Sequence, residues 1–352
     1  MITPLRVGIA GYGVVGRRRR HFLDLNPEME VVAVCDRTFD EPRTIDGVKA
    51  FKSYQELYGE GLDAVFVCLT NDIAPEVTTE MIKRGIHTFC EKPPGRTVED
   101  IASVQDTAAK HPHIKVMYGF NHRYHESVND ALGIVRSGSL GRVINLRGVY
   151  GKSKFISFDQ ASDWRTKRAV AGGGILLDQG IHMVDLMRLF AGEFQDVHSF
   201  VSNAYWKHDV EDNAYALMRT ADNTVAMLHS SATQWRHRFN LEIGLERGGI
   251  TLSGILSGSK SYGAETLTVI WPDDDDKGDP REQTTRYNRD PSWPNEIAAF
   301  ANAILRDIPI KNGTIEDAYR TMDLVYRIYM ADPEWREHWG LNAHLAPAPH
   351  TG

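Results

Sequence analysis

The fold is decided by Leu5-Arg6-Val7-Gly8-Ile9-Ala10-Gly11-Tyr12-Gly13-Val14-Val15-Gly16, which continues through a polar segment to Asn26 and then Val31-Val32-Ala33-Val34-Cys35-Asp36. This is a short apolar run, a glycine turn, a helix-length segment and a second apolar run that ends in an acid. A GxGxxG motif between a strand and a helix, with an acid about twenty residues further on, is typical of dinucleotide binding. The stretch therefore predicts a βαβ unit that holds a dinucleotide.

Each glycine of the turn has its own predicted role. Gly11 lets the strand turn tightly, Gly13 lets a pyrophosphate approach the backbone, and Gly16 lets the helix pack close to the strand. The amides of Val14 and Val15 at the helix start, together with the helix dipole, then face the phosphates.

The end of the second apolar run bears on the choice of cofactor. Asp36 is placed to accept hydrogen bonds from the adenosine ribose hydroxyls and to repel a 2′-phosphate, which favours NAD. Arg37 follows directly and could hold a 2′-phosphate, so NADP stays open.

Length and composition limit the class of protein. A chain of 352 residues predicts two domains, and a net charge of −7 gives no indication of a nucleic-acid or acidic-membrane partner. Arg17 to Arg20 lie within the predicted first helix, and we interpret them as a solvated helix face. Cys35, Cys68 and Cys90 form no CxxC pair, which favours a reducing compartment over a disulfide framework. No signal peptide and no membrane-length apolar run are apparent, so we expect a cytoplasmic protein.

The first part of the chain alternates between predicted strands and helices. After a polar connection to Lys52, strands are expected at 63–69, 86–90 and 114–118, and helices at 73–84 and from Thr97, whose hydroxyl and Asp100 form a capping pattern. Such alternation predicts right-handed crossovers and a parallel sheet with helices on both faces. Ligands bind at the carboxyl ends of such strands, where Gly11, Asp36, Asn71 and Glu91 to Pro94 fall.

The pattern changes near Asn121. Helices are expected over 122–136, 175–190, 293–305 and 315–330, and strands over 142–150, 239–245 and 267–271, with a long polar loop to Ala171 and a hairpin loop over 273–278. Residues 239–245 alternate strictly between apolar and polar, which indicates a sheet with one buried face. We predict a Rossmann domain over 1–122, an α+β domain with a largely antiparallel, open-faced sheet over 123–332, and a poorly patterned tail over 333–352.

Two groups of residues outside the glycine turn suggest chemistry. Lys92 in Glu91-Lys92-Pro93-Pro94 follows a strand and points toward the nicotinamide end of a bound dinucleotide, although a surface lysine before a rigid turn fits the pattern equally well. Asp178 and His182 are spaced i, i+4, which puts both on one helix face together with Asp185. A structural histidine with a supporting aspartate and a metal site are the two other interpretations of this face.

A basic loop and several tryptophans are further candidates. The loop from Lys152 to Arg168 could clamp an anionic substrate such as a nucleotide sugar, although solvated charges explain it as well. Trp164, Trp206 and Trp235 are candidates for sugar stacking, although tryptophans of this kind more often pack in the core.

Three motifs together resemble the glucose–fructose oxidoreductase / inositol dehydrogenase (Gfo/Idh/MocA) family. They are Gly11-Tyr12-Gly13-Val14-Val15-Gly16, Glu91-Lys92-Pro93, and Gly172-Gly173-Gly174-Ile175-Leu176-Leu177-Asp178-Gln179-Gly180-Ile181-His182. Weaker similarity over 296–329 extends the resemblance to nearly the whole chain. It implies an N-terminal Rossmann domain and a C-terminal α+β domain whose open sheet face commonly supports dimers or tetramers.

The resemblance also implies roles for individual residues. Lys92 is the catalytic lysine, Asp178 and His182 are the acid–base pair, and Trp164-Arg165 resembles a segment that closes on the cofactor. After the third strand the family often has Thr-Pro-Asn with a histidine three residues later. This chain has Leu69-Thr70-Asn71 with Ala74 and Pro75, so only Asn71 is carried over. The remaining candidate substrate contacts are Asn121, Arg123, Arg168 and Trp235.

We therefore predict an NAD-dependent oxidoreductase that oxidises, or reversibly reduces, a secondary hydroxyl of a sugar, inositol or nucleotide sugar. The cofactor contacts are Gly11, Gly13, Val14, Val15, Gly16, Asp36, Arg37, Asn71, Glu91, Lys92, Trp164 and Arg165, no metal is expected, and the protein is expected to be a homodimer or homotetramer. The alternatives are an NADP-linked keto-sugar reductase and a non-catalytic NAD-linked regulatory protein on the same fold.

Overall fold

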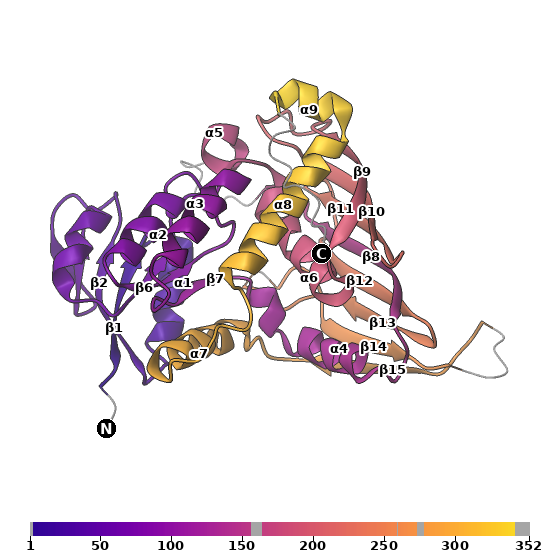
Figure 1. The fold of residues 1–352 in the computed structure, drawn as a ribbon, viewed down its shortest axis with the longest axis horizontal. Helices are drawn as coiled ribbons and strands as arrows, with labels where there is room; N and C mark the ends of the chain where they lie inside the picture. Colours follow the sequence, from indigo (N-terminus) through magenta and orange to yellow (C-terminus); the bar gives the residue numbers. More distant parts are fainter. Residues whose placement is uncertain (1–2, 156–163, 259, 273–277, 342–352) are drawn as a thin grey trace. The chain divides into compact units, whose positions relative to one another are not determined.

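The computed structural model describes residues 3–155, 164–258, 260–272 and 278–341 (Figure 1). The contacts between residues divide the chain into two compact units. Unit 1 comprises 1–121, 169–172 and 292–320, and unit 2 comprises 122–168, 173–291 and 321–352. The predicted hairpin loop over 273–278 lies largely outside the described residues, as does the middle of the basic loop.

Unit 1 is built on a seven-stranded sheet in the described residues. All its strand pairs are parallel except β3–β4. In spatial order the strands are β3 (Arg43–Ile45), β4 (Val48–Phe51), β2 (Met29–Cys35), β1 (Leu5–Ala10), β5 (Ala64–Val67), β6 (His87–Cys90) and β7 (Val116–Tyr118). This is the predicted Rossmann sheet, with β1 and β5 fully buried at its centre apart from Arg6.

The helices of unit 1 pack in two pairs. They are α1 (Val14–Leu23), α2 (Ala74–Lys83), α3 (Val98–Ala109) and α7 (Ser292–Leu305), with a 3₁₀ segment over Tyr54–Glu60. The first helix packs beside α7, and α2 packs beside α3. The predicted capping pattern of α3 is confirmed, because the Asp100 amide donates to Thr97 Oγ1 at 3.3 Å and the Thr97 amide donates to the Asp100 carboxylate at 3.2 Å.

Two predictions for unit 1 are wrong. The polar connection after Asp36 contains the β3–β4 hairpin, whose Asp46-Gly47 turn has positive φ at both residues. That turn chemistry was a local signal for a hairpin. The basic run of α1 is not a uniformly solvated face, because Arg19 is completely buried while Arg17 is exposed.

Unit 2 is built on an eight-stranded sheet in the described residues. Neighbouring strands are antiparallel except β8 and β11, which confirms the predicted largely antiparallel sheet. The spatial order is β15 (Glu282–Tyr287), β14 (Glu265–Ile270), β13 (Gly248–Ser253), β12 (Arg238–Leu245), β8 (Val143–Gly151), β11 (Val225–Ser231), β10 (Asn213–Thr220) and β9 (Phe194–Ser202).

One face of this sheet is covered by helices of the same unit. Helix α4 (Glu126–Ser137) is amphipathic and packs on β13 and β14, and α6 (Ile181–Ala191) packs on β8 and β11 (Figure 1). A methyl group at Gly148 of β8 would lie 2.4 Å from Met187 of α6, so the glycine permits close helix–sheet packing. The burial of β10 and β12 alternates along each strand, as the period-two pattern predicted.

Several predicted elements of the second half begin or end elsewhere. A 3₁₀ turn over Asn121–Tyr124 precedes α4, so the helix expected from His122 starts later. The expected loop before Gly172 contains a 3₁₀ turn over Trp164–Thr166 and the short helix α5 (Arg168–Ala171). Helix α8 (Ile315–Ala331) is confirmed, but the expected tail forms α9 (Pro333–Trp339), whose N-cap Asp332 accepts from the Glu334 and Trp335 amides. A Pro directly after an acidic cap is a start signal that was overlooked.

Candidate functional site

The glycine turn of unit 1 has the geometry that a pyrophosphate requires. Gly11 has φ +91°, and a methyl group on Gly16 would lie only 2.0 Å from the Gly11 carbonyl oxygen. At Gly13 a methyl group would meet nothing within 4 Å, so the space above this exposed residue is open. Gly13 is also the N-cap of α1 and provides no side-chain cap, and no acid lies in the first helical turn. The half-buried Val14 and Val15 thus start a helix whose N-terminus is suited to an anion.

Asp36 stands beside this turn at the end of β2. Its Oδ2 accepts from the Tyr12 amide at 2.8 Å, and its Oδ1 accepts from the Thr38 amide at 3.0 Å and the Thr38 hydroxyl at 2.7 Å. These bonds fix the carboxylate next to the turn, where the fingerprint acid is expected. Arg37, the residue that could hold a 2′-phosphate, directly follows Asp36 and is exposed.

The Glu91 to Pro94 turn follows β6 in the same unit. Lys92 is half-buried, and its peptide bond to Pro93 is cis. Glu91 Oε1 accepts from Arg19 Nε at 2.6 Å. The carboxylate next to Lys92 is therefore tied to the helix that starts at the glycine turn.

Arg19 is the centre of a buried ionic cluster that the sequence analysis missed. Its Nη2 donates to Glu296 Oε2 of α7 at 2.7 Å, and its guanidinium lies 4.4 Å from the ring centroid of Phe89 and 4.2 Å from that of Trp293. Burial disfavours the charged form, but Glu91 and Glu296 outweigh it and raise the pKa of Arg19 above its ordinary value. Nothing in the run of four arginines distinguishes the buried one, because its partners lie 72 and 277 residues away.

Two further predicted residues of unit 1 make contacts within it. The buried Asn71 donates from Nδ2 to the Ala171 carbonyl at 2.7 Å, and Asn121 donates to Ser292 Oγ at 3.1 Å. Both amides thus hold segments of the unit together at the carboxyl end of the sheet, after β5 and β7 respectively.

In unit 2, Asp178 and His182 are both buried, but the segment that carries them is not one α-helix. Leu176–Gly180 forms a π-helical turn, and α6 starts at Ile181. The single helix expected over 175–190 is therefore a π-turn that carries Asp178, followed by an α-helix that carries His182. π-turns of this kind are frequent at functional sites.

The surroundings of Asp178 and His182 are aromatic and polar. Asp178 Oδ1 lies 3.5 Å from Arg165 Nε, and the Arg165 guanidinium stacks 4.3 Å from the centroid of the half-buried Trp164. The His182 ring stacks on that of His122, with centroids 3.7 Å apart and planes 11° apart. Trp164-Arg165 and the Asp178 turn, both predicted, thus meet in one unit.

Two tyrosines and a histidine complete this group and were not predicted as site residues. His122 Nε2 lies 3.2 Å from the Tyr150 hydroxyl, and the rings of Tyr150 and Tyr262 are 5.3 Å apart. Burial raises the pKa of both phenols, and the negative charge of Asp178 adds to the effect. Both tyrosines therefore remain protonated donors near Asp178. Tyr150 lies in the strand expected over 142–150 and is buried in β8, whereas His122 had no local signal.

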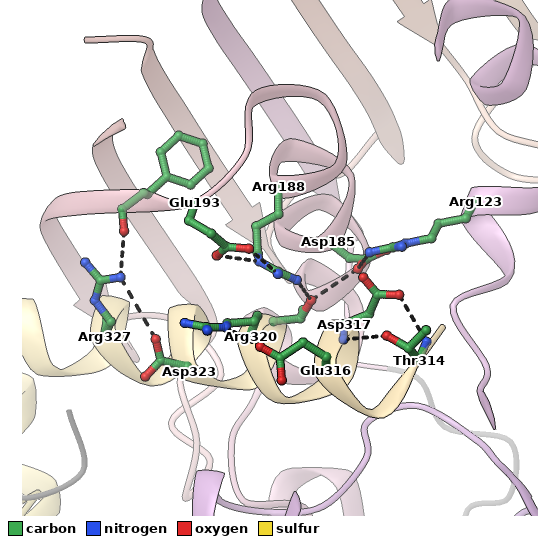
Figure 2. A network of polar contacts seen from close by, with 12 residues as sticks. Arg123, Asp185, Arg188, Glu193, Thr314, Glu316, Asp317, Arg320, Asp323 and Arg327 are labelled. Carbon is green, nitrogen blue, oxygen red and sulfur yellow. Dashed lines mark hydrogen bonds and ion pairs between the residues drawn. The ribbon is translucent and has the colours of Figure 1, made fainter. Parts of the chain in front are cut away.

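Three of the remaining candidates have structural partners in unit 2. Arg123 donates from Nε and Nη2 to Asp185 at 2.7 Å each, and the Thr321 hydroxyl donates to the same carboxylate at 3.1 Å (Figure 2). Arg168 donates to the Trp339 carbonyl at 2.8 Å and stacks over that ring. Arg123, Asp185 and Arg168 therefore bind other parts of unit 2, which the sequence did not reveal.

The tryptophan candidates differ in exposure. Trp235 is 71% exposed and meets Tyr205 edge-on, whereas Trp206 is half-buried and donates to the Ala232 carbonyl at 2.8 Å. Among the described residues, no group of three or more His, Cys, Asp or Glu side chains is arranged to hold a metal ion. None of the described helices is long and apolar enough to cross a membrane.

Comparison with known families gives two adjoining matches. Residues 5–120 match a domain described as "Oxidoreductase family, NAD-binding Rossmann fold", and residues 128–251 match the "GFO/IDH/MocA C-terminal domain". The first match lies within the predicted Rossmann domain over 1–122 and the second within the predicted α+β domain over 123–332.

Individual relatives are similar over part of their length. The D-glucoside 3-dehydrogenase of Escherichia coli is 30% identical over 58% of this chain and 59% of its own, and the 1,5-anhydro-D-fructose reductase of Ensifer adhaerens is 28% identical over 62% and 65%. The chain thus matches less than two thirds of these curated relatives. A solved levoglucosan dehydrogenase in complex with NADH superposes with a TM-score of 0.81 at 19% identity, covering 95% of this chain and 98% of that one, which shows the same fold.

Proposed function

Because the chain belongs to the GFO/IDH/MocA family of oxidoreductases, we propose that it is an NAD-dependent dehydrogenase acting on a secondary hydroxyl of a sugar, inositol or nucleotide sugar. The observation that carries this is the open, uncapped glycine turn beside Asp36, in a chain that also buries Asp178 on a π-turn and His182 at the start of α6. Relatives named for glucosides, anhydrofructose, levoglucosan and inositol support a carbohydrate substrate.

The glycine turn would hold the dinucleotide. The open backbone at Gly13 and the amides of Val14 and Val15 would bind the pyrophosphate, and Asp36 would accept from the adenosine ribose. When bound, the nicotinamide accepts or returns a hydride. Glu91, Asn71, Trp164 and Arg165 are proposed to border it.

The chain's own residues would manage the proton and the developing charge. In the oxidative direction His182 takes the hydroxyl proton, the general-base role that histidine most often has in catalysis. Lys92 orients the same hydroxyl and stabilises negative charge on its oxygen. Asp178, beside Arg165, Tyr150 and Tyr262, hydrogen-bonds the sugar or orients His182.

The proposed substrate contacts are fewer than the sequence suggested. Arg123 is left out, since its guanidinium is engaged by the buried Asp185. Arg168 is left out because it binds Trp339. Asn121 and the exposed Trp235 are kept, and the proposal requires Lys92 and His182 to act on one carbinol group.

The test is initial-rate formation of NADH over a panel of methyl glucoside, levoglucosan, D-xylose and myo-inositol. Lys92→Ala and His182→Ala should each lower kcat by about 10²–10⁴-fold, the usual contribution of one positioned acid–base or charge-stabilising group, while NADH still binds by fluorescence titration. Near-full activity in either variant would refute the role of that residue. NADH binding without turnover of any substrate by the unmodified protein would favour the regulatory alternative.

The same titration decides between cofactors. If NADPH binds more tightly than NADH, and Asp36→Ala leaves NADPH binding intact, the keto-sugar reductase alternative replaces the NAD-linked one. Tighter binding of NADH that is lost in Asp36→Ala supports the proposal, because Asp36 is the residue expected to accept from the ribose hydroxyls.

We also propose a homo-oligomer that forms through the open face of the unit 2 sheet. Large apolar side chains are exposed there, on the face opposite α6: Ile144, Phe200, Tyr215, Leu217, Val225 and Met227. Leu217 pairs with Met227 and Tyr215 with Phe200 across neighbouring strands, so the patch is contiguous. Patches of this kind mark interaction surfaces. Light scattering of Leu217→Glu/Met227→Glu should show a smaller particle than the wild type.

The free thiols of Cys35, Cys68 and Cys90 agree with a cytoplasmic location.

A further inference from the structure

Glu211 is a buried carboxylate that the proposed chemistry does not use. It lies just before β10, is fully buried, and accepts three hydrogen bonds: from the Gly174 amide to Oε2 at 2.7 Å, and from the Leu176 amide and the Tyr329 hydroxyl to Oε1 at 2.9 and 2.8 Å. Its main-chain carbonyl accepts from the Ile175 amide at 3.2 Å. One residue therefore takes three successive amides at the point where the π-turn begins.

The last two residues of the triple glycine permit this approach. A methyl group on Gly174 would lie 2.1 Å from the Glu211 carbonyl oxygen and 2.9 Å from its Oε2, and one on Gly173 would lie 2.4 Å from the Tyr329 hydroxyl. All three distances are shorter than the contacts that a Cβ atom makes in proteins. Gly173 and Gly174 thus make room for Tyr329 and Glu211. At Gly13 in the glycine turn of unit 1, by contrast, the space next to the backbone is open.

The other side of the turn is held by β11. Ser230 Oγ donates to the Ile175 carbonyl at 3.2 Å, and a methyl group on Gly180 would lie 2.4 Å from the same Oγ. Glu211 and Ser230 therefore both bind the start of the segment that carries Asp178 and leads into α6, and Ser230 also lies against Gly180 at the end of the π-turn.

The first amides of a helical segment have no acceptor within it, and a negative charge at that end is favourable. Here the acceptor is a carboxylate 35 to 37 residues further along the chain instead of the usual N-cap side chain. Loss of those bonds would let residues 174–176 move, and Asp178 and His182 would move with them.

We propose that Glu211 is a positioning residue for the proposed dehydrogenase: it sets the placement of Asp178 and His182 by binding the start of the π-turn. This inference rests on the proposed function. Reacting groups displaced by about 1 Å can lower rates by about 10²-fold, so the effect should appear in kcat.

The test compares Glu211→Gln with Asp332→Asn at pH 8. Asp332 is the matched control, because it is also a buried carboxylate of unit 2 that accepts three hydrogen bonds. Its donors are the amides of Val201, Glu334 and Trp335, so it anchors α9 and β9 instead of the π-turn. Glutamine keeps the size of Glu211 but turns an NH₂ group toward an amide donor. Each variant is assayed for kcat, KM for NAD, NADH binding, thermal midpoint and hydrogen exchange by peptide mass spectrometry.

For Glu211→Gln we expect kcat to fall by about 10²-fold with KM for NAD within about twofold of wild type. Exchange should rise in the peptide covering 172–182, and the thermal midpoint should be no lower than that of Asp332→Asn. The control should show faster exchange only near 332–339 and a kcat within about threefold of wild type. Tyr329→Phe, which keeps both amide bonds, should cause a smaller loss of kcat in the same direction and serves as the readout if Glu211→Gln does not fold.

A kcat for Glu211→Gln equal to that of the control, or unchanged exchange over 172–182, would overturn the proposal. If the wild type turns over no sugar of the panel, the proposed function fails. Hydrogen exchange then still decides whether Glu211 holds the turn, so the two failures are distinguishable.

Discussion

Replacement of Arg19 by methionine is the sharpest test of the buried cluster in unit 1. The substitution keeps the apolar stem between Phe89 and Trp293 but removes the charge that binds two carboxylates. The side chain of Glu296 is completely buried and that of Glu91 is 13% exposed, so neither carboxylate can be fully hydrated in the folded variant. Removal of one partner from a buried ion pair typically costs about 3–5 kcal/mol, and we expect a loss of that size at pH 7.5.

The loss should depend on pH in a defined direction. Without Arg19 the folded-state pKa of Glu296 rises above its unfolded value, because burial then acts without the Arg19 charge. Such a group stabilises the fold below its unfolded pKa and loses that contribution as the pH rises through its folded pKa. The difference in unfolding free energy between wild type and Arg19→Met should therefore shrink from pH 7.5 to pH 5.

The assay is urea unfolding followed by tryptophan fluorescence at both pH values, with Arg20→Met as the control. Arg20 lies on the same helix and pairs with Asp24, whose side chain is 46% exposed, so its loss should cost about 1 kcal/mol or less. Glu296→Gln added to Arg19→Met should recover part of the stability. A cost for Arg19→Met as small as that for Arg20→Met, with no pH dependence, would refute the reasoning.

Two further outcomes are expected. Gly16→Ala should abolish NADH binding in a fluorescence titration, because its methyl group would lie 2.0 Å from the Gly11 carbonyl oxygen. The control is Gly133→Ala in α4, where a methyl group meets nothing within 4 Å; it should bind NADH normally and gain about 0.5–1 kcal/mol of stability. Equal NADH binding by both variants would contradict the turn geometry. Burial raises the pKa of Glu211 to about 7, against the opposing hydrogen bonds from Tyr329 and the Gly174 and Leu176 amides. Its stabilising contribution is therefore complete below pH 4 and lost as the pH rises through 7. Wild type should thus lose about 3 kcal/mol relative to Glu211→Gln between pH 4.5 and pH 8 in urea unfolding, and parallel curves for the two would contradict the raised pKa.

The sequence by itself determined the βαβ start, the glycine turn and the sheet class of each half. These depend on local properties: apolar runs of strand length, a helix period between them, and alternation along 239–245. The capping pattern at Thr97 and the acid at Asp36 were visible for the same reason, since each acts over a few residues or at a fixed spacing.

Only the tertiary structure decided which charged residues are buried and what they bind. In the sequence Arg19 does not differ from the arginines beside it, and Glu211 lies in no recognisable motif. Arg123 was expected to contact the substrate, but it binds Asp185. The π-turn at Leu176–Gly180 is likewise held by Glu211 and Ser230, which lie far along the chain. A helical period records which residues share a face, but the partner on that face is chosen by contacts between distant segments, and those exist only once the chain has folded.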